Sequence, residues 1–570
     1  MMSRFSSFKN LVVLLFILLT AGLFNIQVIR GNYYLRLSEH NRIRLLPLIA
    51  PRGRIFDRQG NVLVDNRLTF NVSIVPQEVR DLDKLIAALS ACLSCPQEEL
   101  RKKYKRNFFA TFSPVVVAGD IDKKTAFILE EKRNELNGVI LQTQPSRHYI
   151  YGHIGAHLLG YVGKIAPGEL EKLSAYGYTM LDQIGKTGLE KTYDQYLRGQ
   201  TGGTQIEVDN YGKKVKVLGH KEPTKGQDLT LTIDIDLQKQ ATELLAGRKG
   251  AITVLDVQNG DILAMVSMPD FDPNIFISGK SKEINDLLKD RAGPFLNRNF
   301  DVNCAYPPGS TFKIVNAAAA LELNKITAHT PITCNGKIDI GNRTFNCWRR
   351  DGHGEVDIVD ALRFSCNVFF WRVGMMLGPS ALAAYAKKFG LGQAIGLENF
   401  YQEKGVVPEL RWKRQEIREP WYKGDTLNFS IGQGYLLATP LQVLLMGSVI
   451  ASDGKIVIPR IIKTDDEPKF INTGISLPTI TIVKKGMEEA VASDYGTGHR
   501  AYRNGLSLAA KTGTAQAGKK KSHAWFLGFT PVAKPQIAFV IFLEQGGHGG
   551  DDPADIAAGI CEFLKQKGYV

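Results

Sequence analysis

The sequence of 570 residues is too long for a single hydrophobic core, so about two to four domains are expected. Its 71 Lys and Arg against 57 Asp and Glu give a net charge of +14, which is spread along the chain without a block of like charges. A nucleic-acid-binding arm is therefore not expected. The positive balance suits a protein that works beside anionic lipid head groups.

The first predicted element is a membrane-spanning helix. Residues 10–29 carry no charged side chain and include the run Leu-Val-Val-Leu-Leu-Phe-Ile-Leu-Leu. At about 1.5 Å per residue they span roughly the 30 Å hydrocarbon core of a bilayer. A cleaved signal peptide is the alternative, but the apolar run is long for one and no small-x-small cleavage site follows it closely. We expect residues 1–9 to form a cytoplasmic tail and residues 10–29 an uncleaved anchor.

Residues 30–225 are expected to form a separate α+β domain. Residues 69–75 alternate as in a strand, and apolar residues between 78 and 135 recur at helical spacing. Gly185-Lys186-Thr187 could suggest a phosphate-binding loop, but Met180 stands where that motif requires glycine. The phosphate interpretation therefore fails.

Residues 226–570 are predicted to form a domain around one antiparallel sheet. Its strands are expected at 229–233, 250–257, 261–267, 524–530 and 536–544. A helix over 237–246, capped by Asp236, and a final helix with Pro553 in its first turn are expected to flank the sheet. The fold class is therefore α+β, with a long helical insertion between strands from the two ends.

The insertion contains a serine in a position suited to nucleophilic catalysis. Pro307, Pro308 and Gly309 force a bend, after which a helix is predicted to run from Ser310 to Leu323. A helix N-terminus favours a developing anion, and Lys313 lies three residues on, within reach of the serine hydroxyl. A desolvated lysine amine can act as the base that a serine nucleophile needs. A plain helix-capping serine is the alternative.

Two further motifs decide between these alternatives. Ser365-Cys366-Asn367 lies in a hydrophobic stretch, so its polar side chains need polar partners, and Lys313 would provide one. Lys511-Thr512-Gly513-Thr514 follows an apolar strand pattern. At a sheet edge, Lys511 and Thr512 can hold a peptide carboxylate, while Gly513 lets the peptide backbone approach. The N–H groups of Ser310 and Thr514 would then form an oxyanion hole.

The positions of the seven cysteines indicate a metal site in the insertion. Three of them and one histidine make a closed tetrahedral set of the kind that binds structural zinc: Cys334, Cys347, His353 and Cys366. The alternative is a Cys334–Cys347 disulfide with Cys366 buried. Cys92 and Cys95 are expected to form a local disulfide or to stay free thiols rather than to bind a second metal.

The chain resembles the class B penicillin-binding proteins, most closely the penicillin-binding protein 2 group that serves cell elongation. The resemblance covers nearly the whole chain. The matching segments are 52–58, 188–194, 197–199, Asn297-Arg298, 306–313, 430–434 and 511–516.

The resemblance implies a periplasmic D,D-transpeptidase, anchored in the inner membrane, that cross-links peptidoglycan stem pentapeptides and is acylated by β-lactams. In this family Ser310 would attack the penultimate D-Ala carbonyl, Lys313 would take its proton, and Ser365, Asn367 and Lys511 would complete the site. It also implies that residues 30–225 form a non-catalytic pedestal that contacts a RodA-type glycan polymerase. Some relatives carry a zinc site in the insertion with Asp, His and Cys ligands. The three cysteines and one histidine of this chain match that ligand set only in part.

Two other functions remain open at this point. A D,D-carboxypeptidase would use water in place of the acceptor amine, and the three motifs do not separate it from a transpeptidase. A non-catalytic β-lactam sensor or scaffold would bind penicillin without turnover. A sensor is expected to carry a cytoplasmic signalling domain, whereas about nine residues precede the predicted anchor.

Overall fold

The computed structural model describes residues 2–34, 43–108, 114–179, 182–208, 214–278, 281–289, 295–397, 399–518 and 520–570. The chain forms two compact units. The first comprises Met1–Gly53, Asn66–Arg147 and Tyr196–Gln227, and the second comprises Arg54–Asp65, His148–Gln195 and Asp228–Val570. Neither unit is therefore one continuous stretch of sequence.

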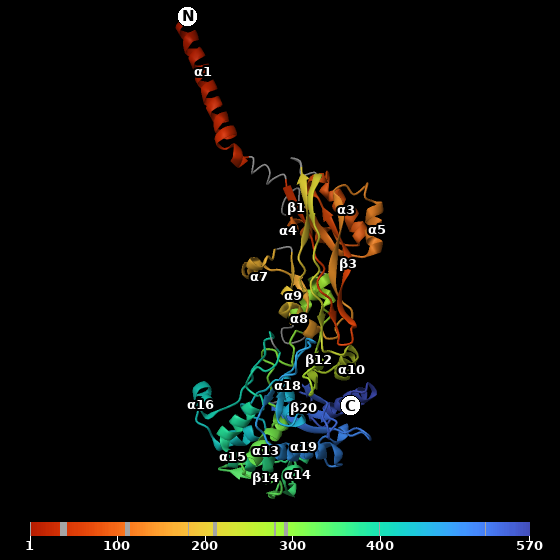
Figure 1. The fold of residues 1–570 in the computed structure, drawn as a ribbon, viewed down its shortest axis with the longest axis vertical. Helices are drawn as coiled ribbons and strands as arrows, with labels where there is room; N and C mark the ends of the chain where they lie inside the picture. The colour runs from red at the N-terminus through yellow and green to blue at the C-terminus, as the bar shows by residue number, and fades with distance from the viewer. Residues whose placement is uncertain are drawn as a thin grey trace. The chain divides into compact units, whose positions relative to one another are not determined.

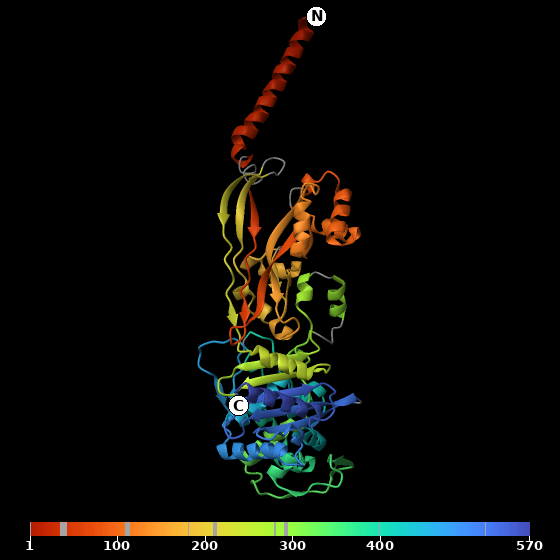
Figure 2. The same cartoon turned by 90° about the vertical axis from the view of Figure 1, so that its right-hand side faces the viewer.

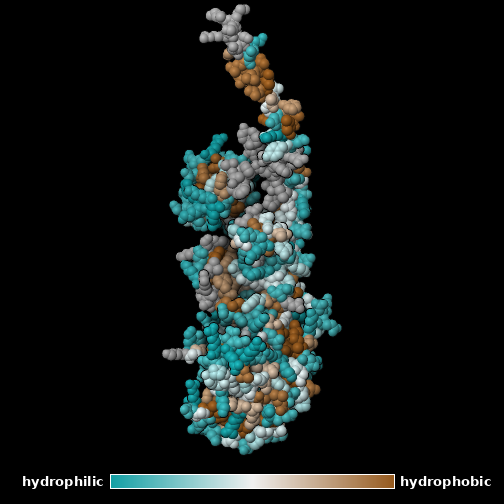
Figure 3. Space-filling model, turned by 90° about the vertical axis from the view of Figure 1, so that its left-hand side faces the viewer, coloured by the Kyte–Doolittle hydropathy of each residue, from teal (hydrophilic) through white to brown (hydrophobic). Residues whose placement is uncertain are grey.

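The first element is the long N-terminal helix α1 (Met2–Phe24), which continues into a π-helical turn (Asn25–Ile29) (Figure 1). The stretch from Phe8 to Ile29 is long and apolar enough to cross a membrane, and its side chains are not packed on a protein core. In Figure 3 brown, the colour of apolar side chains, covers much of this helix, interrupted by a few polar residues in teal. The helix predicted over 10–29 is therefore present, with the length and composition of a single-pass anchor.

Besides α1, the described residues of the first unit contribute to two sheets and form three longer helices. One sheet has the antiparallel order β1 (Ile43–Leu48), β8 (Gly202–Val208), β9 (Lys214–Lys221). In the other, β3 (Val62–Ile74) pairs with β4 (Val115–Ile121) and β5 (Val139–Tyr149). The helices are α3 (Leu82–Leu93), α4 (Gln97–Asn107) and α5 (Lys123–Glu131).

The core of the first unit lies between the β3 sheet and its helices. Val72 and Ile74 of β3 are buried against Leu85, Ile86 and Leu89 of α3. The strand over 69–75 and the helical spacing after residue 78 are both confirmed. The strand β4, however, lies within the span where only helical spacing was expected, because its Val-Val-Val run is short and its pairing partner β3 is distant in sequence.

The central element of the second unit is a five-stranded antiparallel sheet. Its order is β12 (Ile262–Met268), β11 (Gly250–Asp256), β21 (Ile537–Leu543), β20 (Lys520–Thr530), β19 (Ala509–Ala517). Strands from the two ends of the domain thus pair directly, as predicted, and β19 forms one edge. Of the predicted strands only 229–233 differs, because β10 (Leu229–Thr230) pairs in parallel with β2 (Ile55–Phe56) outside this sheet.

Helices cover both faces of this sheet (Figure 2). On one face α10 (Ile235–Leu245) and α20 (Asp552–Gln566) pack their apolar residues on strand residues such as Phe526. The neighbouring Leu527 points to the opposite face, where it meets Gly447 of the fully buried helix α18 (Pro440–Ala451). The final helix begins with Pro553 in its first turn, as predicted.

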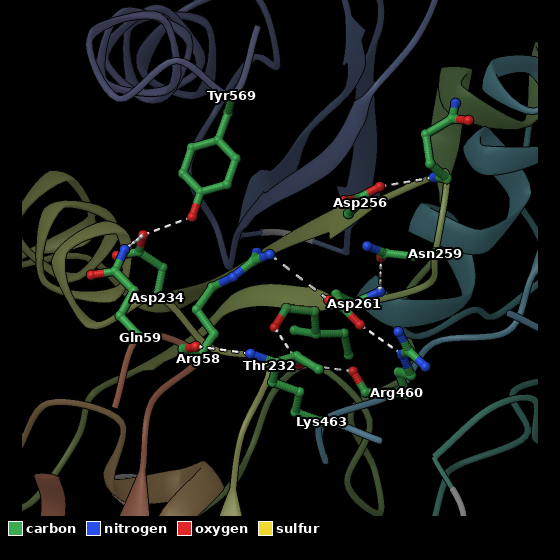
Figure 4. Close-up of polar contacts among 12 residues, drawn as sticks. Arg58, Gln59, Thr232, Asp234, Asp256, Asn259, Asp261, Arg460, Lys463 and Tyr569 are labelled. Carbon is green, nitrogen blue, oxygen red and sulfur yellow. Dashed lines mark hydrogen bonds and ion pairs between the residues drawn. The ribbon is translucent and has the colours of Figure 1, made fainter. Parts of the chain in front are cut away.

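One predicted helix cap is wrong. Asp234, not Asp236, caps α10 by accepting hydrogen bonds from the N–H groups of residues 236 and 237. The second carboxylate oxygen of Asp234 accepts from the Tyr569 hydroxyl at 2.7 Å and from Gln59 Nε2 at 3.1 Å (Figure 4). Lys463 donates to the backbone carbonyl of Arg58 beside it. These bonds tie a short N-terminal segment and the C-terminus to the start of α10, which packs on the sheet.

The insertion and the connections complete the second unit. The longer helices are α13 (Lys313–Glu322), α14 (Ile358–Arg363), α15 (Asn367–Lys388), α17 (Lys423–Ser430) and α19 (Leu477–Ala492). The shorter elements are α6 (Ala156–Leu159), β6 (Val162–Lys164), α7 (Pro167–Leu173), β7 (Gln183–Gly185), α8 (Gly188–Thr192), α9 (Asp194–Leu197), α11 (Asn274–Ser278), α12 (Ser281–Lys289), β13 (Ile332–Cys334), β14 (Lys337–Ile340), β15 (Arg343–Asn346), β16 (Gly354–Val356), α16 (Leu410–Trp412), β17 (Lys455–Val457) and β18 (Phe470–Asn472).

Candidate active site

Ser310 lies at the start of the helix that the sequence predicted. The chain bends at Pro307 and Pro308 and enters a 3₁₀ turn (Gly309–Phe312) that leads into α13. Gly309 has φ +56°, and a Cβ on it would lie only 2.8 Å from the carbonyl oxygen of Thr514, so glycine is required here. Ser310 is partly exposed, which leaves its hydroxyl open to a substrate.

The Lys313 side chain is completely buried and bonds to the second motif. Its amine donates to the Ser365 carbonyl at 2.8 Å, to the Ser365 hydroxyl at 3.2 Å and to Asn367 Oδ1 at 2.7 Å. The expected contact between the first two motifs is therefore present. Among the described residues, the amine bonds to these oxygens rather than to the Ser310 hydroxyl.

Ser365 is held in an unusual backbone conformation. Its φ of +53° lies in the left-handed region, which is uncommon for a residue with a side chain. The next residue, Cys366, caps α15 through its sulfur, which accepts from the N–H of Phe369. This tight link between α14 and α15 presents both the carbonyl and the hydroxyl of Ser365 to one amine. Such strain is common at functional sites.

Two buried lysines lie close enough to influence each other. Burial lowers the pKa of Lys313 to about 8, because no carboxylate compensates its charge, although the Cys366 and Cys347 thiols oppose the shift. Burial and then the charge of Lys313 lower the pKa of Lys511 well below its usual value. From the family resemblance Lys511 is expected to help keep Lys313 neutral, but the charge effect runs from Lys313 to Lys511, whereas the lowered pKa of Lys313 comes from burial.

The third motif lies on the edge strand β19, with Lys511 and Thr512 buried. A Cβ on Gly513 would lie 2.9 Å from the Pro308 carbonyl and 3.0 Å from Thr311, so this part of β19 packs directly on the turn before α13. Ser310 and Thr514 are therefore brought together, as the predicted oxyanion hole requires. The free side of β19 has no neighbouring strand in its sheet, as strand addition requires.

Two residues beside this strand were not singled out as site residues from the sequence. Gln433 Nε2 donates to the carbonyl of Thr514 at 3.3 Å, and the Thr512 hydroxyl donates to the Thr497 hydroxyl at 2.9 Å. Both are flanked by glycine on both sides, in Gly432-Gln433-Gly434 and Gly496-Thr497-Gly498. Glycine flanking a polar residue was the available signal, but it is too common to identify a site.

The four proposed metal ligands converge in the insertion. The ligand atoms of Cys334, Cys347, His353 and Cys366 all lie within 4.8 Å of one another. All seven cysteines are free, so neither the Cys334–Cys347 disulfide nor a Cys92–Cys95 disulfide is formed. The predicted cluster is therefore present, and the disulfide alternative is not.

The geometry of the cluster fits a tetrahedral ion. His353 Nδ1 lies 3.5 Å from the Cys334 sulfur and 3.7 Å from the Cys347 sulfur. Tetrahedral zinc with ordinary bond lengths would separate such nitrogen and sulfur ligands by about 3.6 Å. Hydrogen bonding from Cys366, together with His353 and the N–H groups of Asn367 and Val368, lowers the pKa of the Cys347 thiol. A thiolate is the form that binds metal.

Comparisons with known proteins agree on one family. The profile described as "Penicillin binding protein transpeptidase domain" matches residues 250–562, and "Penicillin-binding Protein dimerisation domain" matches residues 47–231. The "Peptidoglycan D,D-transpeptidase MrdA" of Haemophilus influenzae is 33% identical over 97% of this chain and 91% of its own length.

Solved structures give the same result. The penicillin-binding protein in a structure described as "Complex between Penicillin-Binding Protein (PBP2) and MreC from Helicobacter pylori" is 31% identical, with a TM-score of 0.83 over 93% of this chain and 100% of its own. A chain in "Structural coordination of polymerization and crosslinking by a peptidoglycan synthase complex" is 28% identical, with a TM-score of 0.74 over 98% of this chain and 97% of its own.

Proposed function

Because this chain belongs to the penicillin-binding protein transpeptidase family, we infer that it is a serine-type peptidoglycan D,D-transpeptidase that cross-links stem peptides during cell elongation. The observation that carries the site assignment is the buried Lys313 amine, held by Ser365 and Asn367. A buried lysine without a carboxylate partner is a competent general base near neutral pH.

The first half of the reaction acylates Ser310. Lys313 in its neutral form takes the hydroxyl proton as the serine oxygen attacks the penultimate D-Ala carbonyl of a stem pentapeptide. The N–H groups of Ser310 and Thr514 stabilise the tetrahedral oxyanion. The proton then passes from Lys313 through the Ser365 hydroxyl to the leaving amine, and terminal D-Ala departs. This route is supported by the hydrogen bond between Lys313 and the Ser365 hydroxyl.

The second half transfers the acyl group to a second stem peptide. The acceptor amine attacks the ester carbonyl and loses its proton to Lys313, which becomes able to reprotonate the Ser310 oxygen as the ester bond breaks. In the first half, before terminal D-Ala departs, Lys511, Thr512 and Gly513 of β19 hold the donor peptide as an added strand, with the carboxylate of that D-Ala beside the lysine and the threonine. The carboxylate returns charge to Lys511, whose pKa is lowered in the free enzyme.

The Cys334, Cys347, His353 and Cys366 cluster is proposed to bind one structural zinc ion. Bound zinc would supply a fixed cross-link between the β13–β16 segment and the start of α15, and the acyl transfer needs no metal. Cys366 lies between the two residues that hold Lys313, so the ion would keep that loop in place. The observed ligand spacing and the free thiols support this assignment.

The cellular context is proposed from the relatives. The N-terminal helix has the length of a single-pass anchor, which fits a protein of the inner membrane with its bulk in the periplasm. We assign residues 1–9 to a cytoplasmic tail, 10–29 to the anchor, 30–225 to a non-catalytic pedestal and 226–570 to the transpeptidase domain. A RodA-type glycan polymerase is the proposed partner of the pedestal, and β-lactams are the proposed inhibitors.

The decisive experiment is covalent labelling of the full chain with a fluorescent penicillin. We expect wild type to be labelled and Ser310→Ala to remain unlabelled. A parallel sample treated with a strong zinc chelator is expected to lose labelling and to regain it on addition of zinc. Full labelling of Ser310→Ala would overturn the nucleophile assignment, and labelling that is unaffected by chelation would make the metal dispensable.

A further inference from the structure

The turn Gly496-Thr497-Gly498 connects two parts of the active site. The Thr497 hydroxyl accepts a hydrogen bond from the Thr512 hydroxyl at 2.9 Å. The backbone N–H of Thr497 donates to the carbonyl of Arg363, 3.3 Å away and two residues before Ser365. One residue therefore contacts both the strand proposed to hold the substrate carboxylate and the end of α14, which leads into the loop proposed to hold the general base.

The position of Thr497 is fixed by its backbone. The N–H of Gly498 donates to the carbonyl of Ala490 at the end of α19, and a Cβ on Gly496 would lie only 2.3 Å from that same oxygen. A Cβ on Gly550 would lie 2.5 Å from the Thr497 carbonyl, so the chain packs closely on the turn from this side as well. The Thr497 hydroxyl is thus held in a defined place, and the residue remains partly exposed.

The direction of the hydroxyl pair matters because each threonine has one proton to donate. In the structure the Thr512 proton is directed to Thr497, so it is not directed to a substrate. Among the described residues the Thr497 hydroxyl has no other hydrogen-bond partner. The pair can therefore reverse, with Thr497 donating to Thr512, which frees the Thr512 proton for a bound carboxylate.

We infer that Thr497 is a positioning residue for the carboxylate of the donor peptide and of β-lactams. Its hydroxyl orients Thr512 and, after reversal, leaves Thr512 as a donor to that carboxylate. Hydrogen bonds to a charged acceptor are stronger than neutral ones. The hydrogen bond from Thr497 to Thr512 therefore strengthens the hydrogen bond from Thr512 to the carboxylate. This inference rests on the proposed function, because it requires the carboxylate to bind beside Lys511 and Thr512.

The matched variants are Thr497→Ser and Thr497→Ala. Both lack the γ-methyl group, so they differ only in the hydroxyl. Thr481→Ala, which removes an exposed hydroxyl on α19 that donates to its own helix, is the control for threonine loss elsewhere in the same segment. The readout is the second-order rate constant of Ser310 acylation by benzylpenicillin, which has a free carboxylate, and by its methyl ester, which has none.

We expect Thr497→Ala to slow acylation by benzylpenicillin by about five- to tenfold, the effect of one lost hydrogen bond. The rate with the methyl ester should change by less than about twofold, because the ester offers no anionic acceptor. Thr497→Ser should behave as wild type with both compounds. The ratio of the acylation rate with the acid to that with the ester should therefore fall only when the hydroxyl is removed.

Two results would overturn the inference. In one, Thr497→Ala acylates with benzylpenicillin as fast as Thr497→Ser. In the other, acid and ester slow equally, which identifies a packing role. Melting temperatures of both variants report folding, and Thr497→Val replaces the alanine variant should that one unfold. Failure of the proposed function is a separate outcome, since wild type would then show no Ser310-dependent acylation at all.

Discussion

Two lysines that are both buried in the second unit have opposite chemistry. The Lys313 amine bonds to oxygens of Ser365 and Asn367, none of which carries a formal charge. The Lys413 side chain is 1% exposed, but its amine pairs with Asp425 at 2.6 Å and Glu419 at 3.5 Å. The two sites therefore differ in the presence of a carboxylate, and Lys413 also lies closer to the surface, since its partner Glu419 is 53% exposed.

The pKa values follow from this difference. Burial lowers the pKa of Lys313 to about 8. Burial would also lower the pKa of Lys413, but the hydrogen bond and the charge of Asp425 outweigh it and raise the pKa above its usual value. Lys413 stays charged and ties the segment around Trp412 to α17. A buried lysine thus becomes a general base only where no carboxylate compensates its charge.

The largest effect is expected from Lys313→Met, which removes the base but keeps an apolar chain of similar length. Acylation by penicillin should fall by about a thousandfold, in the range that general-base catalysis contributes. The melting temperature should stay within a few degrees of wild type, because removal of an uncompensated buried amine is not costly. Rapid-quench acylation and thermal unfolding measure the two quantities. Acylation within about tenfold of wild type would contradict the assignment of Lys313.

Lys413→Met should show the reverse pattern. The free energy of unfolding should fall by about 3 kcal/mol, since the poorly exposed Asp425 carboxylate loses its partner. The folded fraction should still be acylated within about twofold of the wild-type rate. Denaturant unfolding followed in parallel with penicillin labelling tests both points, and Asp425→Asn provides the matched change on the other partner. A thousandfold loss of acylation with unchanged stability would erase the contrast between the two lysines.

The pH dependence of acylation should reveal which lysine is the base. Lys313 is active when neutral, so the acylation rate should rise with pH up to a pKa of about 8 and level off above it. Below that pKa the rate should fall by about tenfold per pH unit. The Lys413→Met variant should keep the same profile, because Lys413 does not titrate in this range. A flat profile between about pH 6.5 and 9 would exclude a lysine base with this pKa.

The smallest effect is expected at the other Lys-Thr-Gly of the sequence, residues 186–188. Lys186 forms an ion pair with Glu169 at 2.6 Å, and Thr187 precedes the short helix α8 rather than lying on a sheet edge. Lys186→Ala should change the free energy of unfolding by less than about 1 kcal/mol, as for other partly exposed ion pairs. Acylation should remain at the wild-type rate, whereas Lys511→Ala in the same assay should lose it. A strong loss in Lys186→Ala would give this tripeptide a role that its surroundings do not suggest.

The elements around Ser310 and Lys511 could be predicted from the sequence, whereas the cap of α10 could not. The bend before Ser310, the helix after it and the edge strand with Lys511 follow from local signals such as Pro307, Pro308 and the alternating apolar residues. The cap of α10 was misassigned from Asp234 to Asp236 because both residues have the right chemistry. The choice depends on Tyr569 and Gln59, which bond to Asp234 from opposite ends of the chain.

The positioning of Thr497 was not predictable for a similar reason. A threonine between two glycines is an ordinary turn, and its link to Thr512 exists only because α19 ends beside β19. The pairing of β4 with β3 was missed as well, since strand pairing over a long sequence separation leaves little local trace.

The sequence by itself determined the membrane-length helix, the antiparallel α+β fold, the three motifs proposed to be catalytic and the four residues of the Cys/His cluster. Each of these depends on residue type and short-range spacing, which a linear sequence contains. Only the tertiary structure decided which oxygens surround Lys313, which lysine meets a carboxylate and which hydroxyl supports Thr512. These properties depend on desolvation and on contacts between residues far apart in the chain, and both arise only when the chain is folded.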